Sequence, residues 1–194
     1  MTECDPVKGS PVQRTGVPHA HRKNLPLPGW IRGEHLSGNM QPQQTPKQWD
    51  VSVQPDGHSG LDCKAGQFVW LKIGHSSFSM KENSLSICSA PGFGPEVSSM
   101  IKELGGFTQT IGQIKTGTAA YLDGSYGNLC VDGRTEPGGA LIAGGVGLVP
   151  LLGIVREMRL TGDPRKVKLM YGNRVVDQIA FRDELGEQDV LYVL

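Results

Sequence analysis

The hydrophobic and polar positions divide the chain into three stretches of different pattern. Residues 1–47 are rich in Pro, Gly, Gln, His and Lys and show no sustained period of either 2 or 3.6. A segment of this composition buries little apolar surface. We therefore expect residues 1–48 to form an irregular or disordered N-terminal arm.

From residue 49 to residue 136 the pattern is that of short strands. "WDVSV" alternates, "GQFVWLKIG" is rich in β-branched and aromatic residues, and "SLSICSAPG", "EVSSMIKEL" and "TAAYLDGSYG" are short strand-like runs bordered by turn residues. Before the last of these runs, "GGFTQTIGQI" places Phe107, Ile111 and Ile114 on one helical face. Several short strands in succession predict a barrel or sandwich over residues 49–136.

After residue 137 strand-like and helix-like runs alternate. An apolar strand at 140–143 precedes a glycine turn and a helix at 149–160, followed by strand "KVKLMYG", helix "DQIAFRDEL" and strand "VLYVL". This alternation predicts a parallel α/β unit over residues 137–194. A doubly wound sheet usually has five or six strands. Further strands are therefore missing, supplied by a partner, or were never present.

The uncharged run 137–155 is nearly long enough to cross a bilayer. Its glycines and Pro150 give a poor apolar surface, so we interpret it as a strand, a turn and a helix rather than a membrane span. The N-terminus shows no apolar signal segment. A cytoplasmic protein is expected, at the inner face of a membrane only if a partner holds it there.

Charge and cysteine spacing exclude several classes of function. The chain has 19 basic and 19 acidic residues, so no net charge favours binding to nucleic acid or anionic lipid. No Cys-x-x-Cys pair occurs, and the five histidines lack metal-ligand spacing. We expect no metal site, and reduced cysteines at positions 4, 63, 88 and 130.

A glycine turn between a strand and a helix brings backbone N–H groups to the positive end of the helix dipole, where phosphate binds well. Gly144, Gly145 and Gly147 occupy such a turn, and Pro150 suits the first turn of the helix. Tight packing between helix and strand also selects glycine, so both interpretations stay open. The next strand ends near Asn173 and Arg174, and Arg174 is either a partner for the 2′-phosphate of NADP or an exposed arginine.

Several segments together resemble one family. "AGGVGLVPLLGIVREM" and "VKLMYGNRVVDQIAFRDEL" look like the pyridine-nucleotide domain of the ferredoxin–NADP⁺ reductase superfamily, and four upstream segments follow its flavin-binding barrel in order. These segments are "AGQFVWLKIG", "FSMKENSLSICSAP", "IKELGGFTQTI" and "YLDGSYGN". The resemblance is strongest to the ferric-reductase-like and NADPH-oxidase-like branch. It implies an antiparallel Greek-key FAD-binding barrel followed by a parallel Rossmann-like NAD(P)-binding domain that is truncated at its C-terminal end.

The resemblance implies a flavin site on the strand after "MKE". A basic residue, an aromatic and a Ser or Thr contact the flavin in the family, and Asn83, Ser84, Leu85 and Ser86 stand there in this chain. Ser86 matches the residue near flavin N5 and is the candidate catalytic residue. Leu85 and Asn83 replace the aromatic and the basic residue, which predicts weaker FAD binding. Lys81 or Lys102 either supplies the missing cation or is simply solvated.

Two further segments are implied as cofactor contacts. One consists of Gly105, Gly106, Phe107 and Thr108, and it resembles the family's turn into a short helix that contacts the flavin pyrophosphate. Thr108 is alternatively a plain helix cap. The other is Gly124-Ser125-Tyr126-Gly127, which stands where the family has Gly-Pro-Tyr-Gly at the junction of the two domains. Gly124 and Tyr126 are the candidate contacts in it.

The implied activity is electron transfer from NAD(P)H through FAD to an external one-electron acceptor, either a ferric chelate or a haem partner such as a membrane haem protein. Relatives have a first barrel strand before "WDVSV" and a C-terminal segment after "VLYVL", and neither has a clear equivalent in this sequence. The alternative is therefore a non-catalytic fragment or divergent binding module that keeps the fold without tight FAD binding.

Overall fold

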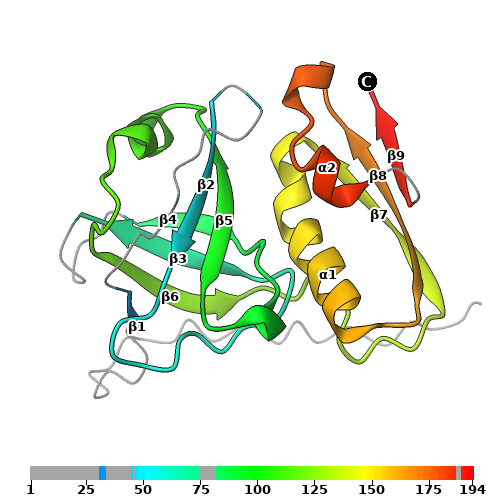
Figure 1. Ribbon diagram of the computed structural model, residues 1–194, viewed down its shortest axis with the longest axis horizontal. Coiled ribbons are helices and arrows are strands. Elements are labelled where there is room, and N and C mark those ends of the chain that lie inside the picture. Colours follow the sequence, from blue (N-terminus) through cyan, green and yellow to red (C-terminus); the bar gives the residue numbers. More distant parts are fainter. Residues whose placement is uncertain (1–30, 34–44, 46, 75–81, 187–188) are drawn as a thin grey trace, which may run out of the picture.

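The computed structural model describes residues 31–33, 45, 47–74, 82–186 and 189–194. The first part is an antiparallel unit made of two sheets, one with strand order β1-β6-β3-β4 and one pairing β2 with β5 (Figure 1). The strands are β1 (Ile31–Gly33), β2 (Gln48–Val53), β3 (Phe68–Ile73), β4 (Asn83–Ser86), β5 (Val97–Lys102) and β6 (Ala120–Tyr126).

The two sheets enclose an apolar core that follows the strand alternation. Every second residue of β3, namely Val69, Leu71 and Ile73, is buried against Val51 and other residues of the same core. The 3₁₀ helix η2 (Gly106–Gln113) covers the core with Ile111, while Phe107 and Ile114 pack beside it. The predicted antiparallel fold and the predicted apolar face of segment 105–114 are both confirmed.

Strand β1 is a difference from the sequence-based expectation. It lies within the segment expected to be irregular, and it pairs antiparallel with β6, with Ile31 opposite Leu122. Pairing through backbone N–H and C=O groups requires no periodic apolar pattern, so no local pattern in the sequence predicts this strand. The remainder of the expected arm lies outside the described residues, apart from residues 45, 47 and 48.

The second part is a parallel sheet with order β7-β8-β9, as predicted. Leu141 lies opposite Leu169, and Leu169 opposite Val190, with all strands running in one direction. The strands are β7 (Gly138–Gly144), β8 (Lys166–Gly172) and β9 (Val190–Val193); the helices between them are η3 (Gly145–Gly147), α1 (Leu148–Thr161), η4 (Val176–Gln178) and α2 (Arg182–Leu185).

The helix expected over "DQIAFRDEL" is only partly present. Residues 176–178 form one 3₁₀ turn and α2 spans only four residues. Ile179 is extended and Phe181 adopts a left-handed conformation with φ of 57°, which interrupts the helical hydrogen bonds. In this interrupted conformation Ile179 and Leu185 are buried against the sheet, so tertiary packing overrides the local helical preference.

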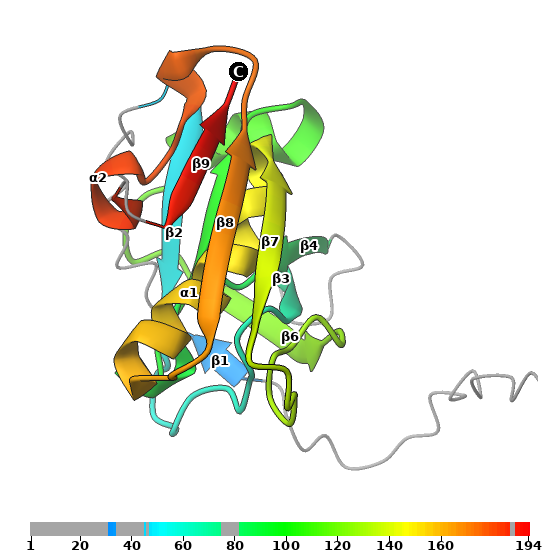
Figure 2. The same cartoon turned by 90° about the vertical axis from the view of Figure 1, so that its right-hand side faces the viewer.

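Helix α1 and the segment 176–185 lie on the same face of the parallel sheet, over buried Leu169 and Tyr171. Figure 2 shows the other face without a helix over it, and there Ile142, Met170 and Leu191 are exposed. Within the described part of the chain, no helix has the length and hydrophobicity that crossing a membrane requires.

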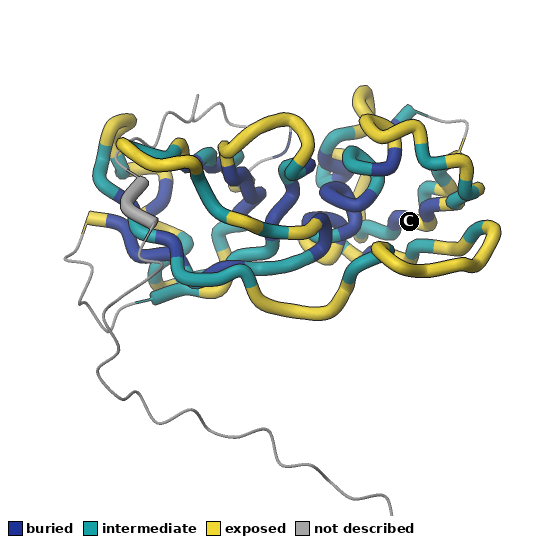
Figure 3. The backbone as a smooth tube through the Cα atoms, turned by 90° about the horizontal axis from the view of Figure 1, so that it is seen from below, coloured by how far each residue is buried: buried dark blue, intermediate teal, exposed yellow. Residues whose placement is uncertain are grey.

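Helix α1 also forms the contact between the two parts of the molecule. Ala65, Cys88 and Met100 of the antiparallel unit belong to the same buried cluster as Leu152 of α1. Segment 87–92, which includes part of the 3₁₀ turn η1 (Pro91–Phe93), runs directly along this helix. In Figure 3 the buried stretches lie inside the two units, and many of the exposed ones lie in connecting loops.

Candidate functional site

The glycine loop stands at the carboxyl end of β7 and leads directly into α1. Gly145 has a φ of 51°, a left-handed conformation that disfavours other residues. The N-terminus of α1 carries no side-chain cap, but its first turn offers few N–H groups, because Leu148 N–H donates to the carbonyl of Gly145 and Pro150 has none. Pro150 lies in that first turn, as predicted.

The space around the glycines bears on whether packing or a ligand requires them. A Cβ added at Gly144 or Gly147 would meet no atom within 4 Å, and one at Gly145 would meet only Asn173 Oδ1, at 3.9 Å. A Cβ added at Gly153, in the middle of α1, would lie 2.9 Å from the carbonyl oxygen of Ile87. Close packing therefore accounts for Gly153 and does not account for the loop glycines.

The ends of β7 and β8 bring the remaining nucleotide-site candidates to the same edge. Gly144 lies opposite Gly172, so Asn173 and Arg174 follow β8 beside the glycine loop. Asn173 Nδ2 is buried and has no hydrogen-bond partner among the described residues. Arg174 is exposed. Ligands of parallel α/β sheets bind beyond the carboxyl ends of the strands, and these groups lie there.

A cavity of about 190 Å³ lies between the antiparallel unit and the glycine loop. Ser84, Leu85, Ser86 and Thr108 of the predicted flavin site line it, whereas Asn83, Gly105, Gly106, Phe107, Gly124 and Tyr126 are not among its lining residues. Val146 of the glycine loop and Val149 of α1 also line it. The cavity therefore joins the candidate flavin strand to the candidate nucleotide loop.

Thr108 makes its hydrogen bonds within its own turn. Its hydroxyl accepts from the N–H groups of Leu104 and Gly105, at 2.9 and 3.2 Å, and donates to the carbonyl of Gly105 at 2.8 Å. These are the contacts of a capping residue. Gly105 and Gly106 have positive φ values, and an added Cβ at either would meet nothing within 4 Å. This turn therefore presents an open surface beside the cavity.

Lys102 is the cation that the described residues bring to the cavity. It lies at the end of β5 among the lining residues, and its Nζ donates to Gln178 Oε1 of the parallel unit at 3.4 Å. Lys81, the other candidate cation, lies outside the described residues. Leu85 packs partly against the antiparallel core, where an aromatic was expected from the family pattern.

The turn at residues 124–127 lies two strands away from Ser86 on the same sheet. Phe68 of β3 lies opposite both Ser86 of β4 and Tyr126 of β6, so Ser86 and Tyr126 are about 10 Å apart between Cα atoms. The ring centroids of Tyr126 and Phe68 lie 5.8 Å apart, and the Tyr126 hydroxyl donates to Asp123 Oδ1 at 2.9 Å. The sequence pattern marked Phe68 only as a strand residue, and its place in this row comes from the register.

The described cysteines, Cys63, Cys88 and Cys130, are free thiols. Burial raises the pKa of Cys88 to about 11 and also raises the pKa of Cys63. Cys88 is fully buried at the contact between the two units. No group of three metal-ligating side chains occurs among the residues that the structure describes.

The comparisons with known proteins match this geometry. A family model described as the oxidoreductase NAD-binding domain matches residues 141–192, which include most of β7, the glycine loop, α1 and β8. The reductase component of propane 2-monooxygenase from Mycolicibacterium goodii is 31% identical over 149 residues, covering 73% of this chain and 42% of that protein. The gamma subunit of sulfhydrogenase 2 from Pyrococcus furiosus is 33% identical, covering 63% of this chain and 41% of that protein.

Solved structures extend the similarity to both units. Phthalate dioxygenase reductase superposes with a TM-score of 0.71 at 21% identity, covering 84% of this chain and 51% of that one. The FAD/NAD-binding domain of nitric oxide dioxygenase from Vibrio cholerae superposes with a TM-score of 0.67 at 18% identity, covering 85% and 78%. The chain spans about two fifths of the length of the curated relatives it matches. The chain therefore has the fold of ferredoxin–NADP⁺ reductase-like proteins, and its residues 141–192 match the oxidoreductase NAD-binding domain.

Proposed function

We propose that this chain is the flavin- and nicotinamide-binding part of an NAD(P)H-dependent reductase. The observation that carries the proposal is the shared cavity, which Ser84, Leu85 and Ser86 line from one side and Val146 of the glycine loop lines from the other. A nicotinamide nucleotide bound at the glycine loop would thus lie beside a flavin bound at β4. Bound FAD would supply acceptance of two electrons from NAD(P)H and their release one at a time.

The residues present fit a flavin at this place. The cavity of about 190 Å³ is smaller than the roughly 300–1,000 Å³ of pockets that enclose a whole ligand, so it suits one part of a dinucleotide. The open turn at Gly105 and Gly106 and the ammonium of Lys102 lie at its border and suit a pyrophosphate. Ser86 would hydrogen-bond near flavin N5, and Leu85 would contact the ring with less stacking area than an aromatic.

The nucleotide-binding groups lie at the edge of the parallel sheet. The glycine loop would present its backbone N–H groups to the pyrophosphate, since Gly145 and Gly147 leave the approach open. Asn173 would gain a partner for its buried Nδ2. Arg174, exposed beyond β8, would pair with the 2′-phosphate, so NADPH is the proposed donor in preference to NADH.

For the acceptor we propose a separate redox chain. The relatives are by name a reductase component of a monooxygenase, a hydrogenase subunit and electron-transfer subunits of dihydroorotate dehydrogenase, each of which is part of a larger system. A ferric chelate and a membrane haem chain remain the alternatives suggested by the family branch that the motifs resemble. We also propose a cytoplasmic location, at the inner face of a membrane only if the acceptor chain holds the protein there.

The experiment is a titration of the full chain with FAD, NADPH and NADH, followed by NADPH oxidation with three acceptors. Ferric citrate, cytochrome c and a ferredoxin represent a chelate, a haem protein and an iron–sulfur protein. We expect binding of FAD and NADPH, and faster reduction of the protein acceptors than of the chelate. Binding of a nicotinamide nucleotide without FAD would instead support the non-catalytic binding module that Asn83 and Leu85 favour. Binding of neither would refute the proposal.

A further inference from the structure

Segment 87–92 connects the candidate flavin strand to the contact with α1. It begins directly after Ser86, and Ile87 and Cys88 are both fully buried. Their N–H groups donate within the antiparallel unit, from Ile87 to the carbonyl of Gln67 at 2.9 Å and from Cys88 to that of Ser98 at 2.8 Å. The segment is thus fixed to the antiparallel unit, and a displacement of this segment would displace Ser86.

Arg156 of α1 joins this segment to α2. Its Nη1 donates to the carbonyl of Cys88 at 2.9 Å, and its Nε and Nη2 donate to the two carboxylate oxygens of Glu184 at 2.6 and 2.7 Å. The guanidinium also lies over the ring of Phe181, 5.3 Å from its centroid. Because Glu184 and Phe181 hold the guanidinium plane in place, the remaining nitrogen, Nη1, can donate only toward the carbonyl of Cys88.

The same helix carries the glycine loop at its start. Arg156 follows Leu148 by eight residues, which is roughly 12 Å along a helix that rises 1.5 Å per residue. A rigid helix therefore has the nucleotide loop at one end and the bond to segment 87–92 about two turns further on. The bond made by Arg156 relates the position of the loop to that of Ser86.

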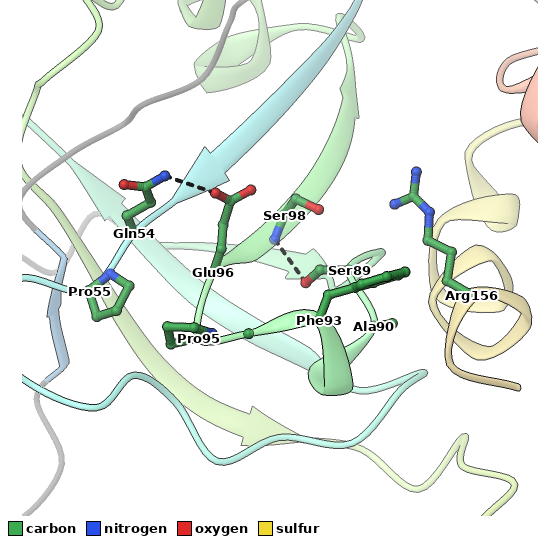
Figure 4. Close-up of a pocket in the computed structure, with 10 residues that line it drawn as sticks. Gln54, Pro55, Ser89, Ala90, Phe93, Pro95, Glu96, Ser98 and Arg156 are labelled. Atoms are coloured by element: carbon green, nitrogen blue, oxygen red, sulfur yellow. Dashed lines mark hydrogen bonds between the residues drawn. The ribbon is translucent and has the colours of Figure 1, made fainter. Parts of the chain in front are cut away.

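The contact beside Arg156 is not closed by packing. A cavity of about 690 Å³ opens between α1 and the antiparallel unit, lined by Ser89, Ala90, Phe93 and Arg156 among others (Figure 4). Phe93 is 69% exposed there. Elsewhere the units are held by the close packing of Gly153 on Ile87 and by the hydrogen bond from Lys102 to Gln178. Beside the cavity, the hydrogen bonds from Arg156 to Cys88 and from Gly92 N–H to Glu157 Oε2, at 3.1 Å, are the directional contacts between α1 and segment 87–92.

We infer that Arg156 is a positioning residue that sets the orientation of the parallel unit relative to the flavin strand. The effect of Arg156 on the relative orientation of the two units does not require a bound ligand. Its effect on electron transfer rests on the proposed function, because a misplacement of about 1 Å between reacting groups costs about a hundredfold in rate.

Arg159 offers a matched control on the same helix. Its Nη1 and Nη2 donate to the carbonyls of Glu184 and Leu185, at 2.9 and 3.0 Å, so these bonds stay within the parallel unit. Arg156→Met and Arg159→Met remove the same fork from the same helix. Only the first removes a hydrogen bond to the antiparallel unit.

The test measures residual dipolar couplings of the full chain labelled with ¹⁵N. In the wild type and in Arg159→Met, we expect the couplings of both units to fit one alignment tensor with the same relative orientation. In Arg156→Met we expect each unit to keep its internal couplings while the relative orientation changes or averages. An Arg156→Met protein with the wild-type orientation would overturn the inference.

Arg156→Lys keeps the charge without the fork and provides a milder variant if the methionine variant does not fold. We expect a smaller change of orientation in the same direction, and a wild-type orientation would count against the inference. In protein loaded with FAD, Arg156→Met should slow flavin reduction by NADPH about 10- to 100-fold with unchanged affinities for both ligands. If the chain binds neither ligand, the proposed function fails, and the dipolar couplings still decide the role of Arg156.

Discussion

Alanine substitution at Gly147 and at Gly153 should have different effects. We expect Gly147→Ala to weaken NADPH binding with little change in stability, and Gly153→Ala to lower stability without a change in NADPH binding. At Gly147, with φ of −61° and ψ of −11°, alanine fits the backbone and its Cβ would meet nothing within 4 Å. The reduced entropy of the unfolded chain favours alanine by about 0.4–1 kcal/mol. The loss of glycine at a helix N-cap opposes it by a similar amount. The free energy of unfolding should therefore change by less than about 1 kcal/mol.

At Gly153 the same methyl group would lie 2.9 Å from the carbonyl oxygen of Ile87, a backbone atom of a fully buried residue. Alanine gains about 1 kcal/mol in helix propensity. Overpacking costs about 1–3 kcal/mol. We expect a net loss of up to about 2 kcal/mol, which at about 2–4 °C per kcal/mol lowers the melting temperature by up to about 8 °C.

Nucleotide binding should show the reverse pattern. The methyl group of Gly147→Ala stands where a pyrophosphate approaches the first turn of α1, so we expect at least about a tenfold loss in NADPH affinity, or about 1.4 kcal/mol. Gly153→Ala should bind NADPH as the wild type does. The assays are calorimetric titration with NADPH and thermal melting of the two variants. Unchanged affinity in Gly147→Ala, together with a lowered melting temperature, would refute the assignment of the loop to phosphate binding.

Three further predictions address single side chains. Leu85→Tyr should raise FAD retention through desalting, because a ring contact adds on the order of 1 kcal/mol; unchanged retention in a protein that binds FAD would show that position 85 does not limit affinity. Arg174→Ala should weaken NADPH binding by about 1.5–3 kcal/mol and leave NADH binding unchanged, as measured by calorimetry; an equal loss for both would exclude a 2′-phosphate contact. Burial raises the pKa of Cys88 from its ordinary value of 9.0 to about 11, so its contribution to stability is present below pH 9.0 and is lost as the pH rises toward 11. Denaturant titrations at several pH values should show this loss in the wild type, and Cys88→Ala should reduce it.

The sequence predicted the elements whose patterns are local. The alternation in β2, the β-prone run of β3, the strand and helix expected at 140–143 and 149–160 and the parallel arrangement of the last three strands all follow from residue periodicity and turn chemistry. Ser86 and Val146, which lies between the loop glycines, line a common cavity, because the order of the family motifs brings the flavin strand and the glycine loop together.

Other features depend on contacts that no local pattern shows. Strand β1 forms through pairing with β6, and the helix around residue 180 breaks because burial of Ile179 and Leu185 is favoured over continued helical hydrogen bonds. The sequence left the glycine loop open between packing and phosphate, and the empty space around Gly144 and Gly147 argues against packing. The bonds of Arg156 join residues 68 and 28 positions away, so sequence reasoning missed them.

The most direct test of the central claim is anaerobic reduction of the FAD-loaded chain by NADPH, followed through the flavin absorbance. The shared cavity of the flavin strand and the glycine loop predicts that the yellow absorbance bleaches on addition of NADPH, faster than for free FAD at the same concentration. Bleaching should be several-fold slower in Gly147→Ala at NADPH concentrations near the wild-type Kd. A chain that binds FAD and keeps its full flavin absorbance in the presence of bound NADPH would contradict the account.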